Sequence, residues 1–316
     1  MIINLIPEFL AARASSAPDA AYQAYLDRHH AVLEGYWHNY VLDLDSPHRA
    51  EVVARALAAR RDDLRRLMAD VDLERVTAEV LDRAATILEL DQDVDVYLTV
   101  GVGAANAAEL VVGGRGVVVV CVEHFTGEPN PETYGLGLSP RLLPLWIAHE
   151  VAHTVRYTSP TSRSELKRLV AEAGGTYDYW ETGSRATLRE LLVNEGVAVH
   201  AARAAAPGFA EEEYFGFTRR QFRRMRELEA FLFRAAEPDL DRAGLGLRLR
   251  YLSGGMSPAA RLVQGRVLPE RCGYYLGARM VEPLAAERGV ASAARATTAE
   301  FDAAAARQAA GRAVGA

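Results

Sequence analysis

The stretch PLWIAHEVAHTVRY, residues 144–157, decides the fold that we predict for this chain. Pro144 suits the first turn of a helix, because its ring presets the backbone angle and its missing N–H would have no partner there. Small and apolar residues surround the polar residues His149, Glu150 and His153, as in a helix buried in a protein core. We therefore expect a buried helix with a polar group on one face.

The segments on either side of this helix differ in character. Residues 7–90 carry apolar residues three or four positions apart among charged ones, which predicts helices. Residues 94–125 are rich in β-branched residues around a glycine turn, which predicts a hairpin in a small sheet. After the central helix we expect a helix over 162–173, a loop over 173–184, a helix from Ser184 to Pro207, and further helices from Glu211 onward.

The sequence thus predicts an α+β fold in three consecutive parts. Residues 1–92 form a helical N-terminal region, residues 93–206 an α+β core, and residues 207–316 a helical C-terminal region. We find no repeat of fixed period and no long linker.

Charge and composition narrow the possible partners. Acidic residues outnumber basic ones by 42 to 36, and the net charge of −6 gives no general attraction to nucleic acid or anionic membranes. No apolar segment approaches the ~20 residues of a membrane span, and the N-terminus does not resemble a secretory signal. Cys121 and Cys272 are too few for a disulfide framework and are expected to be buried. We therefore expect a cytoplasmic protein.

The His-Glu-x-x-His pattern has a specific chemical meaning on a helix. Residues four apart lie one above the other, so His149 and His153 would present both imidazoles to one metal ion. Glu150 is rotated by about 100°, which places its carboxylate beside the metal, where water would bind. A catalytic zinc has three protein ligands and leaves its fourth position to water. The alternative is an amphipathic surface helix whose polar residues fall into this pattern by chance.

A third ligand has to come from elsewhere in the chain. Glu195 stands out because its neighbours are apolar, and a buried carboxylate is costly unless a cation or hydrogen bonds compensate it. Gly196 beside it would allow close approach of another backbone. The alternative for Glu195 is an ion pair with Arg189, and His200 is the next candidate ligand. The other acidic candidates after His153 are Glu165, Glu172, Asp178, Glu181 and Glu190.

Three blocks of the sequence together resemble a bacterial family of zinc-dependent proteases long catalogued as a domain of unknown function. The blocks are HEVAHTVRY (149–157), LLVNEGVAVHAAR (191–203) and CGYYLGARMVEPL (272–284), and the resemblance covers roughly residues 94–283. The family has a His-Glu-x-x-His helix, then a Glu-Gly-x-Ala helix, then a Gly-Tyr-x-x-Gly segment. The resemblance implies a zincin-like core of the gluzincin type, with one Zn²⁺ held by His149, His153 and Glu195 and with Glu150 as catalytic base. Ala278 stands where the family often has a second tyrosine.

A hydrolase of this kind also needs a donor that stabilises the developing oxyanion. In the third block, Tyr274 shares a helical face with small residues, and we predict that its hydroxyl is this donor, with Tyr275 and Arg279 as alternatives. A tyrosine packed between helices is the structural alternative for Tyr274.

Two further features have both a functional and a structural interpretation. By analogy with zincins, the hairpin over residues 109–125 would add a substrate strand to the sheet, and His124 would be either a cleft residue or, as we favour, a structural histidine. The arginines of residues 218–234 predict an amphipathic helix with a solvated basic face, with binding of an acidic substrate or a membrane surface as the alternative.

Together these observations predict a cytoplasmic zinc metallopeptidase acting on a peptide or protein substrate. Glu150 and Tyr274 would be catalytic, and the helical C-terminal region would complete the cleft. Two alternatives stay open: a regulatory or scaffold protein whose metal clamps two helices, and a hydrolase of non-peptide amides.

Overall fold

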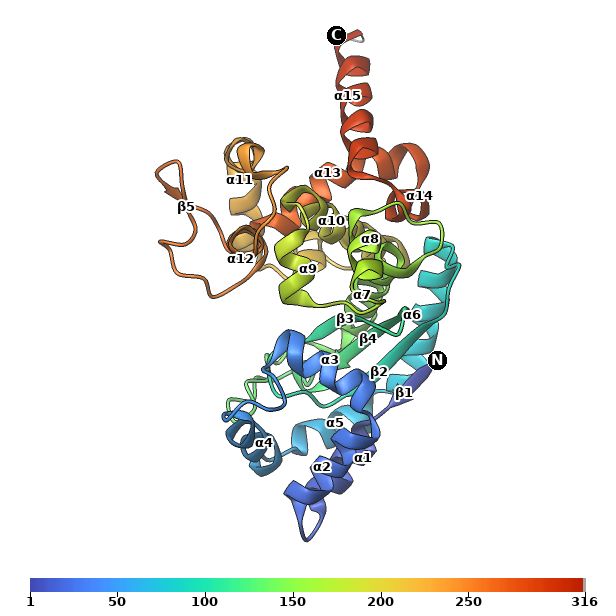
Figure 1. Cartoon of the computed structure of the whole chain (residues 1–316), viewed down its shortest axis with the longest axis vertical. Coiled ribbons are helices and arrows are strands. Elements are labelled where there is room, and N and C mark those ends of the chain that lie inside the picture. The colour runs from blue at the N-terminus through green and yellow to red at the C-terminus, as the bar shows by residue number, and fades with distance from the viewer. Residues whose placement is uncertain (315–316) are drawn as a thin grey trace.

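A mixed four-stranded sheet lies at the centre of the α+β fold (Figure 1). The computed structural model describes residues 1–314, with side chains described up to residue 310. The strand order is β1-β2-β4-β3, in which β1, β2 and β4 are parallel and β3 is antiparallel at one edge. The strands are β1 (Ile2–Asn4), β2 (Val94–Thr99), β3 (Ala107–Val112) and β4 (Arg115–Cys121).

The predicted hairpin is confirmed, whereas β1 was not expected from the sequence. β3 and β4 pair around Gly113 and Gly114, both with positive φ, which glycine adopts without a steric penalty. β1 is only three residues long, and it pairs Ile2 with Val96 across more than ninety positions of sequence. A three-residue strand shows too little alternation to be recognised without its partner.

The N-terminal region is otherwise helical, as predicted. Most of its helices gather at one end of the molecule, whereas α6 runs along the sheet and packs against the central helix α7 (Leu143–Thr158). The helices are α1 (Ile6–Ala14), α2 (Pro18–Arg28), α3 (His30–Tyr40), α4 (Arg49–Ala58), α5 (Asp62–Asp70) and α6 (Leu73–Leu88).

Helix α7 is the buried helix that the stretch 144–157 predicts, and it lies between the sheet and α10 (Leu188–Ala205). Two short helices, α8 (Glu165–Glu172) and α9 (Tyr179–Arg185), connect α7 to α10. The predicted loop over 173–184 is therefore partly wrong: Asp178 caps α9 by accepting hydrogen bonds from the N–H groups of residues 180 and 181. The next helix begins at residue 188 and not near 184, because the Thr187 side chain caps it.

The C-terminal region packs α13 (Cys272–Arg288) against α10 along an extensive contact. A small hairpin and the last helix extend outward from the body in different directions (Figure 1). The remaining elements are α11 (Arg219–Ala236), α12 (Leu245–Leu252), β5 (Leu262–Val263), β6 (Arg266–Val267), α14 (Val290–Arg295) and α15 (Thr298–Val314), with short 3₁₀ turns at Val122–His124, Pro140–Leu142, Glu211–Phe215 and Glu237–Asp239.

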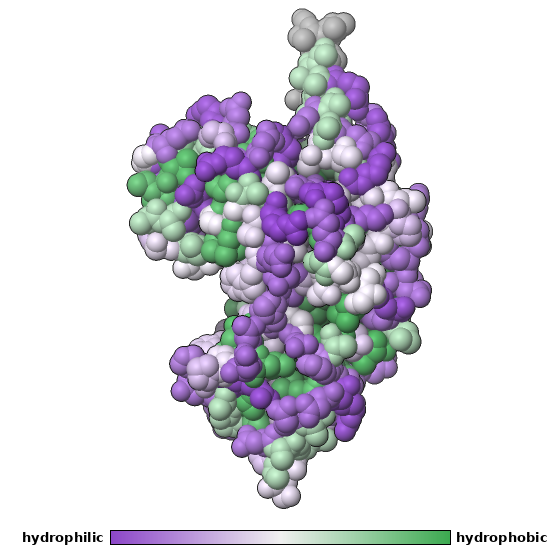
Figure 2. All heavy atoms as spheres, viewed as in Figure 1, coloured by the Kyte–Doolittle hydropathy of each residue, from purple (hydrophilic) through white to green (hydrophobic). Residues whose placement is uncertain are grey.

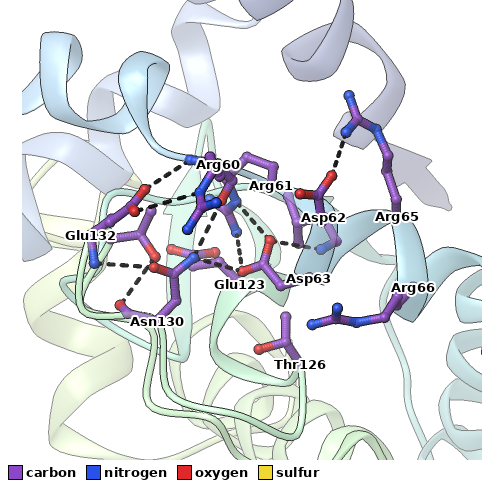
Figure 3. Close-up of polar contacts among 12 residues, drawn as sticks. Arg60, Arg61, Asp62, Asp63, Arg65, Arg66, Glu123, Thr126, Asn130 and Glu132 are labelled. Carbon is purple, nitrogen blue, oxygen red and sulfur yellow. Dashed lines mark hydrogen bonds and ion pairs between the residues drawn. The ribbon is translucent and has the colours of Figure 1, made fainter.

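A polar cluster holds the long loop that leads from β4 into α7 (Figure 3). The Asp63 carboxylate accepts hydrogen bonds from the buried Arg61 at 3.2 Å and from Asn130 in the loop at 3.0 Å. The backbone N–H of Arg60 donates to Glu132 at 2.9 Å. These contacts attach the loop to the start of α5 before the chain enters α7.

Cys121 and Cys272 are both buried and unpaired, as predicted. Among the described residues, no helix combines the length and the apolar character that crossing a bilayer requires.

Candidate metal centre

Helix α7 presents His149 and His153 from one face, one turn apart. The centroids of the two imidazoles are 4.9 Å apart, and each side chain is only 2% exposed. Burial lowers the pKa of His149 to about 3 and lowers that of His153 as well. Both rings are therefore neutral near pH 7, which is the form that binds a metal.

Helix α10 brings Glu195 to the same point. Its Oε2 atom lies 3.4 Å from Nε2 of His149 and 3.7 Å from Nε2 of His153, and this oxygen has no hydrogen-bond partner. The three predicted ligands thus converge, with their ligand atoms all within 4.8 Å of one another. We call His149, His153 and Glu195 the metal group.

The spacing of these atoms fits a zinc ion. Tetrahedral ligands at zinc-to-ligand distances of 2.0–2.1 Å lie about 3.4 Å from each other. An unpartnered carboxylate oxygen that faces two imidazole nitrogens at nearly this distance is a costly arrangement unless a cation joins them. The residues present therefore fit a divalent metal held by three protein ligands.

Glycines explain why α10 and α13 can approach so closely. A Cβ at position 196 would overlap the backbone carbonyl of Gly277, and a Cβ at 277 would overlap the carbonyl of Leu192. The prediction that Gly196 allows close approach of another backbone is confirmed. This contact brings Glu195 and the start of α13 to the same side of the metal group.

A hydrogen-bonded chain supports the group from behind. The Asn194 amide donates to the Tyr157 hydroxyl at 3.0 Å, and this hydroxyl donates to Oε1 of Glu109 at 3.0 Å. The Tyr40 hydroxyl donates to the other Glu109 oxygen at 2.8 Å. Glu109 is therefore a buried carboxylate anchored by two tyrosines, one from α3 and one from α7.

Glu150 lies beside the metal group and close to Glu109. One carboxylate oxygen of each, together with a ring nitrogen of His153, form a second set of atoms within 4.8 Å of one another. Burial raises the pKa of Glu150 well above its ordinary value, and the neighbouring carboxylates Glu109 and Glu195 raise it further. Glu150 therefore holds a proton more readily than a carboxyl group in water does.

Glu109 was expected from the sequence only as the first residue of a hairpin. Its signal was nevertheless present, because it is the one charged residue in the strand AAELVV. Glu195 was predicted as a ligand because it is an acid in apolar surroundings, and Glu109 has surroundings of the same kind.

The structure distinguishes between Tyr274, Tyr275 and Arg279, the three candidates for the oxyanion donor. The Tyr274 ring stacks on His149, with centroids 6.1 Å apart and planes 19° apart, and lines the cleft. Tyr275 instead donates to Glu229, and Arg279 pairs with Glu282 and Glu229, so both point away from the metal group. Of these three residues, only Tyr274 lines the cleft.

The other proposed ligands have different partners. Glu190 forms a fully buried ion pair with Arg156, and Arg189 pairs with Asp241 and Asp302, not with Glu195. His200 lies against the carbonyl of Ala278. The remaining candidates also lie apart from the group: Glu165 accepts from Thr187, Glu172 pairs with Arg168 and Arg185, Asp178 caps α9, and Glu181 lies 3.6 Å from Arg185.

The metal group lies in a cleft with a volume of about 460 Å³. Figure 2 shows the surface hollowed between the lobe of the N-terminal helices and the lobe that carries α11 and α12. Side chains from both lobes line the cleft, including Tyr40 of α3 and Leu252 of α12. The cleft therefore connects the metal group to solvent.

The edge of β3 is only partly available for a substrate strand. The Glu109 carbonyl accepts from the Tyr40 hydroxyl at 3.0 Å, and the Val111 carbonyl accepts from the Tyr177 N–H at 3.3 Å. Residues 104–107 and Glu109 line the cleft. The start of β3 therefore borders the cleft, whereas Tyr40 and Tyr177 bond to carbonyls further along this edge.

His124 and the arginine-rich helix lie outside the cleft. The Nδ1 atom of His124 accepts from the backbone N–H of Leu136 at 3.2 Å, and the ring is buried, which fits a structural role. In α11, Arg223 and Arg224 lie near Glu227, and Arg219 donates to Glu212 at 3.1 Å. The basic face of α11 is exposed to solvent.

Comparison with known protein families, with curated proteins and with solved structures found no match. A function for this chain therefore has to be inferred from the geometry of its site.

Proposed function

We propose that this chain is a zinc-dependent metallopeptidase with a zincin-like core of the gluzincin type. The observation that carries the proposal is the convergence of His149, His153 and Glu195 at zinc-ligand spacing, with Glu150 beside them in an open cleft. A bound zinc ion would supply a Lewis acid that acidifies water and polarises a carbonyl group.

The chain's own residues have separate roles in this proposal. Glu150 takes a proton from the attacking water on its carboxylate and passes it to the leaving amine, for which a raised pKa is suitable. The Tyr274 hydroxyl, held beside His149, donates to the developing oxyanion. Glu109 keeps a negative charge next to Glu150 and so makes the Glu150 carboxylate a stronger proton acceptor.

Two features favour an enzyme over a metal-clamped scaffold. A structural zinc site closes with four protein ligands, whereas the described residues supply three at this point, and the cleft leaves the group accessible. A scaffold also has no need for a buried glutamate that follows the first histidine. Action on a non-peptide amide remains the alternative function, and a cytoplasmic location is a separate prediction.

The test compares wild type with Glu150→Gln. We expect both proteins to bind one zinc ion per chain, measured by elemental analysis, and only wild type to cleave a broad peptide library, measured by mass spectrometry. Rate loss for the variant should be at least about 100-fold, as for other general bases. Full metal content with no cleavage by wild type would favour the scaffold, and cleavage of small non-peptide amides alone would redirect the proposal to that class.

A further inference from the structure

Arg271 is a cation of the cleft that has no carboxylate partner. It lines the cleft together with Tyr274 and the metal-ligand residues, and it forms no ion pair within the part of the chain that the structure describes. Most other arginines of the chain pair with an Asp or Glu side chain, as Arg156 and Arg189 do. An arginine left unpaired in a cleft has donors available for a ligand.

Packing at the start of α13 restricts the backbone around Arg271. Its backbone has φ of 55°, an unusual conformation for a residue with a side chain, directly before α13. The next residues hold this conformation: Cys272 is fully buried, and a Cβ at Gly273 would crowd Leu252 and Leu192. Backbone strain of this kind persists only where surrounding packing enforces it, and it is common at ligand sites.

Aromatic and glycine residues define where the guanidinium lies. Its central carbon is 4.3 Å from the centroid of the Tyr274 ring and 5.9 Å from that of Phe217. A Cβ at Gly216 would lie 3.2 Å from a terminal nitrogen of Arg271, so the absence of a side chain there makes room for the guanidinium. The guanidinium thus lies beside the proposed oxyanion donor, in a residue that lines the cleft.

The charge of the cleft supports an anionic ligand. Arg248, the other arginine of the cleft, is buried and donates to the Tyr177 hydroxyl and the Tyr179 carbonyl, both at 2.8 Å. Three glutamates line the cleft as well. With a bound divalent cation, the positive charges of the cation and the two arginines would exceed the negative charges of these glutamates. This contrasts with the net charge of −6 for the whole chain.

We propose that Arg271 determines specificity by binding a carboxylate of the peptide substrate close to the cleaved bond. This inference rests on the proposed peptidase function. The carboxylate belongs either to the C-terminus of the peptide or to an Asp or Glu side chain, and both would form a bidentate pair with the guanidinium.

The experiment measures binding, so that it does not depend on turnover. The probes are N-acetylated, alanine-rich hexapeptides with one phenylalanine, in four versions: free C-terminal carboxylate, C-terminal amide, amide with one aspartate, and amide with one asparagine. Titrations use Glu150→Gln with and without zinc, followed by the fluorescence of Trp146 and Trp180, which both line the cleft.

We expect a carboxylate-bearing peptide to bind roughly 10- to 100-fold more tightly than its neutral counterpart. Arg271→Met should abolish this ratio while neutral peptides still bind, and Arg271→Lys should retain part of it. Arg220→Met, which removes an exposed arginine of α11 outside the cleft, should leave the ratio unchanged. A preference for the free terminus or for aspartate identifies the source of the carboxylate.

The inference is overturned if neutral and charged peptides bind equally, or if the preference survives Arg271→Met. An equal loss of binding for all four peptides would give Arg271 a merely structural role. Cleavage of neutral and charged peptides alike by wild type would leave the peptidase proposal standing without this inference. If carboxylate-bearing peptides bind more tightly but no peptide is hydrolysed, Arg271 remains a carboxylate-binding residue and the peptidase proposal fails.

Discussion

At the scale of single residues, the buried carboxylates differ in how their charge is balanced. Glu190 has a guanidinium partner in Arg156, and Glu109 has two tyrosine hydroxyls. Glu195 has an oxygen with no hydrogen-bond donor and two neutral imidazoles beside it. Glu190 also has an oxygen without a hydrogen-bond donor, but the guanidinium of Arg156 balances its charge, whereas the charge of Glu195 is left for a metal ion to balance.

Replacing Glu195 therefore tests the metal centre directly. Loss of a residue that merely supports a ligand typically weakens metal binding by 10–100-fold, so Glu195→Gln should weaken zinc binding by more than about 100-fold. The measurement is a competition titration with a chelating dye. Glu181→Gln, at an exposed glutamate, should bind zinc as wild type does. Equal zinc affinity of the two variants would exclude Glu195 as a ligand.

The Arg156–Glu190 pair has a structural role that can be measured separately. Both side chains are 0% exposed, so Arg156→Met would leave a buried carboxylate uncompensated. We expect a loss of about 3–5 kcal/mol in the free energy of unfolding, measured by urea denaturation. Arg185→Met breaks a pair with Glu172 that is about 40% exposed and should cost less than about 1 kcal/mol. Equal losses would contradict this interpretation.

At the scale of elements, the contact between α10 and α13 determines whether the site is complete. Glu195 comes from α10, and Tyr274 and Arg271 come from the start of α13, so a shift between these helices would separate the proposed metal ligand Glu195 from the two residues proposed to bind substrate. The helices approach each other through Gly196 and Gly277, and no other residue type leaves this space.

A single methyl group should be enough to disturb this contact. Gly196→Ala places a Cβ against the carbonyl of Gly277, and we expect a loss of about 1–3 kcal/mol in unfolding free energy, together with weaker zinc binding. Gly246→Ala in α12 is the matched control, because its Cβ would meet nothing within 4 Å. It should stabilise the protein by about 0.5–1 kcal/mol. Thermal unfolding of the two variants measures the difference, and a neutral Gly196→Ala would show that the helices can separate without cost.

At the scale of the whole molecule, a bound metal would join parts that are distant in sequence. Helix α7 packs on the sheet, and α10 connects it to α13 and the C-terminal helices. An ion shared by α7 and α10 binds only the folded chain and therefore stabilises all of it.

Metal removal should therefore lower the melting temperature. At a free zinc concentration of 100 times Kd, linkage adds about 2.7 kcal/mol to the stability of the folded state. We expect zinc to raise the Tm of the metal-free protein by several degrees in differential scanning calorimetry, and EDTA to reverse the change. Glu195→Gln should lose most of the shift, whereas Glu181→Gln should keep it. A zinc-dependent shift of the same size in Glu195→Gln would locate the metal elsewhere.

The sequence by itself determined the local features of this protein. The helix over residues 144–157, the hairpin around Gly113 and the helical N-terminal region result from periodicity, β-branched residues and turn glycines, which act over a few positions of the chain. The grouping of His149 and His153 is equally local, because residues four apart on a helix share a face. Glu195 was found because an acid among apolar residues implies a compensating partner.

Only the tertiary structure decided which distant residues meet. The strand over residues 2–4 exists because β2 supplies its hydrogen-bonding partner, and Glu109 joins the site because β3 passes behind α7. Arg271 and Tyr274 face the cleft, whereas Tyr275 and Arg279 do not, because the glycine contact between α10 and α13 sets the rotation of α13. Such choices depend on packing between segments far apart in sequence, and no pattern within one segment encodes them.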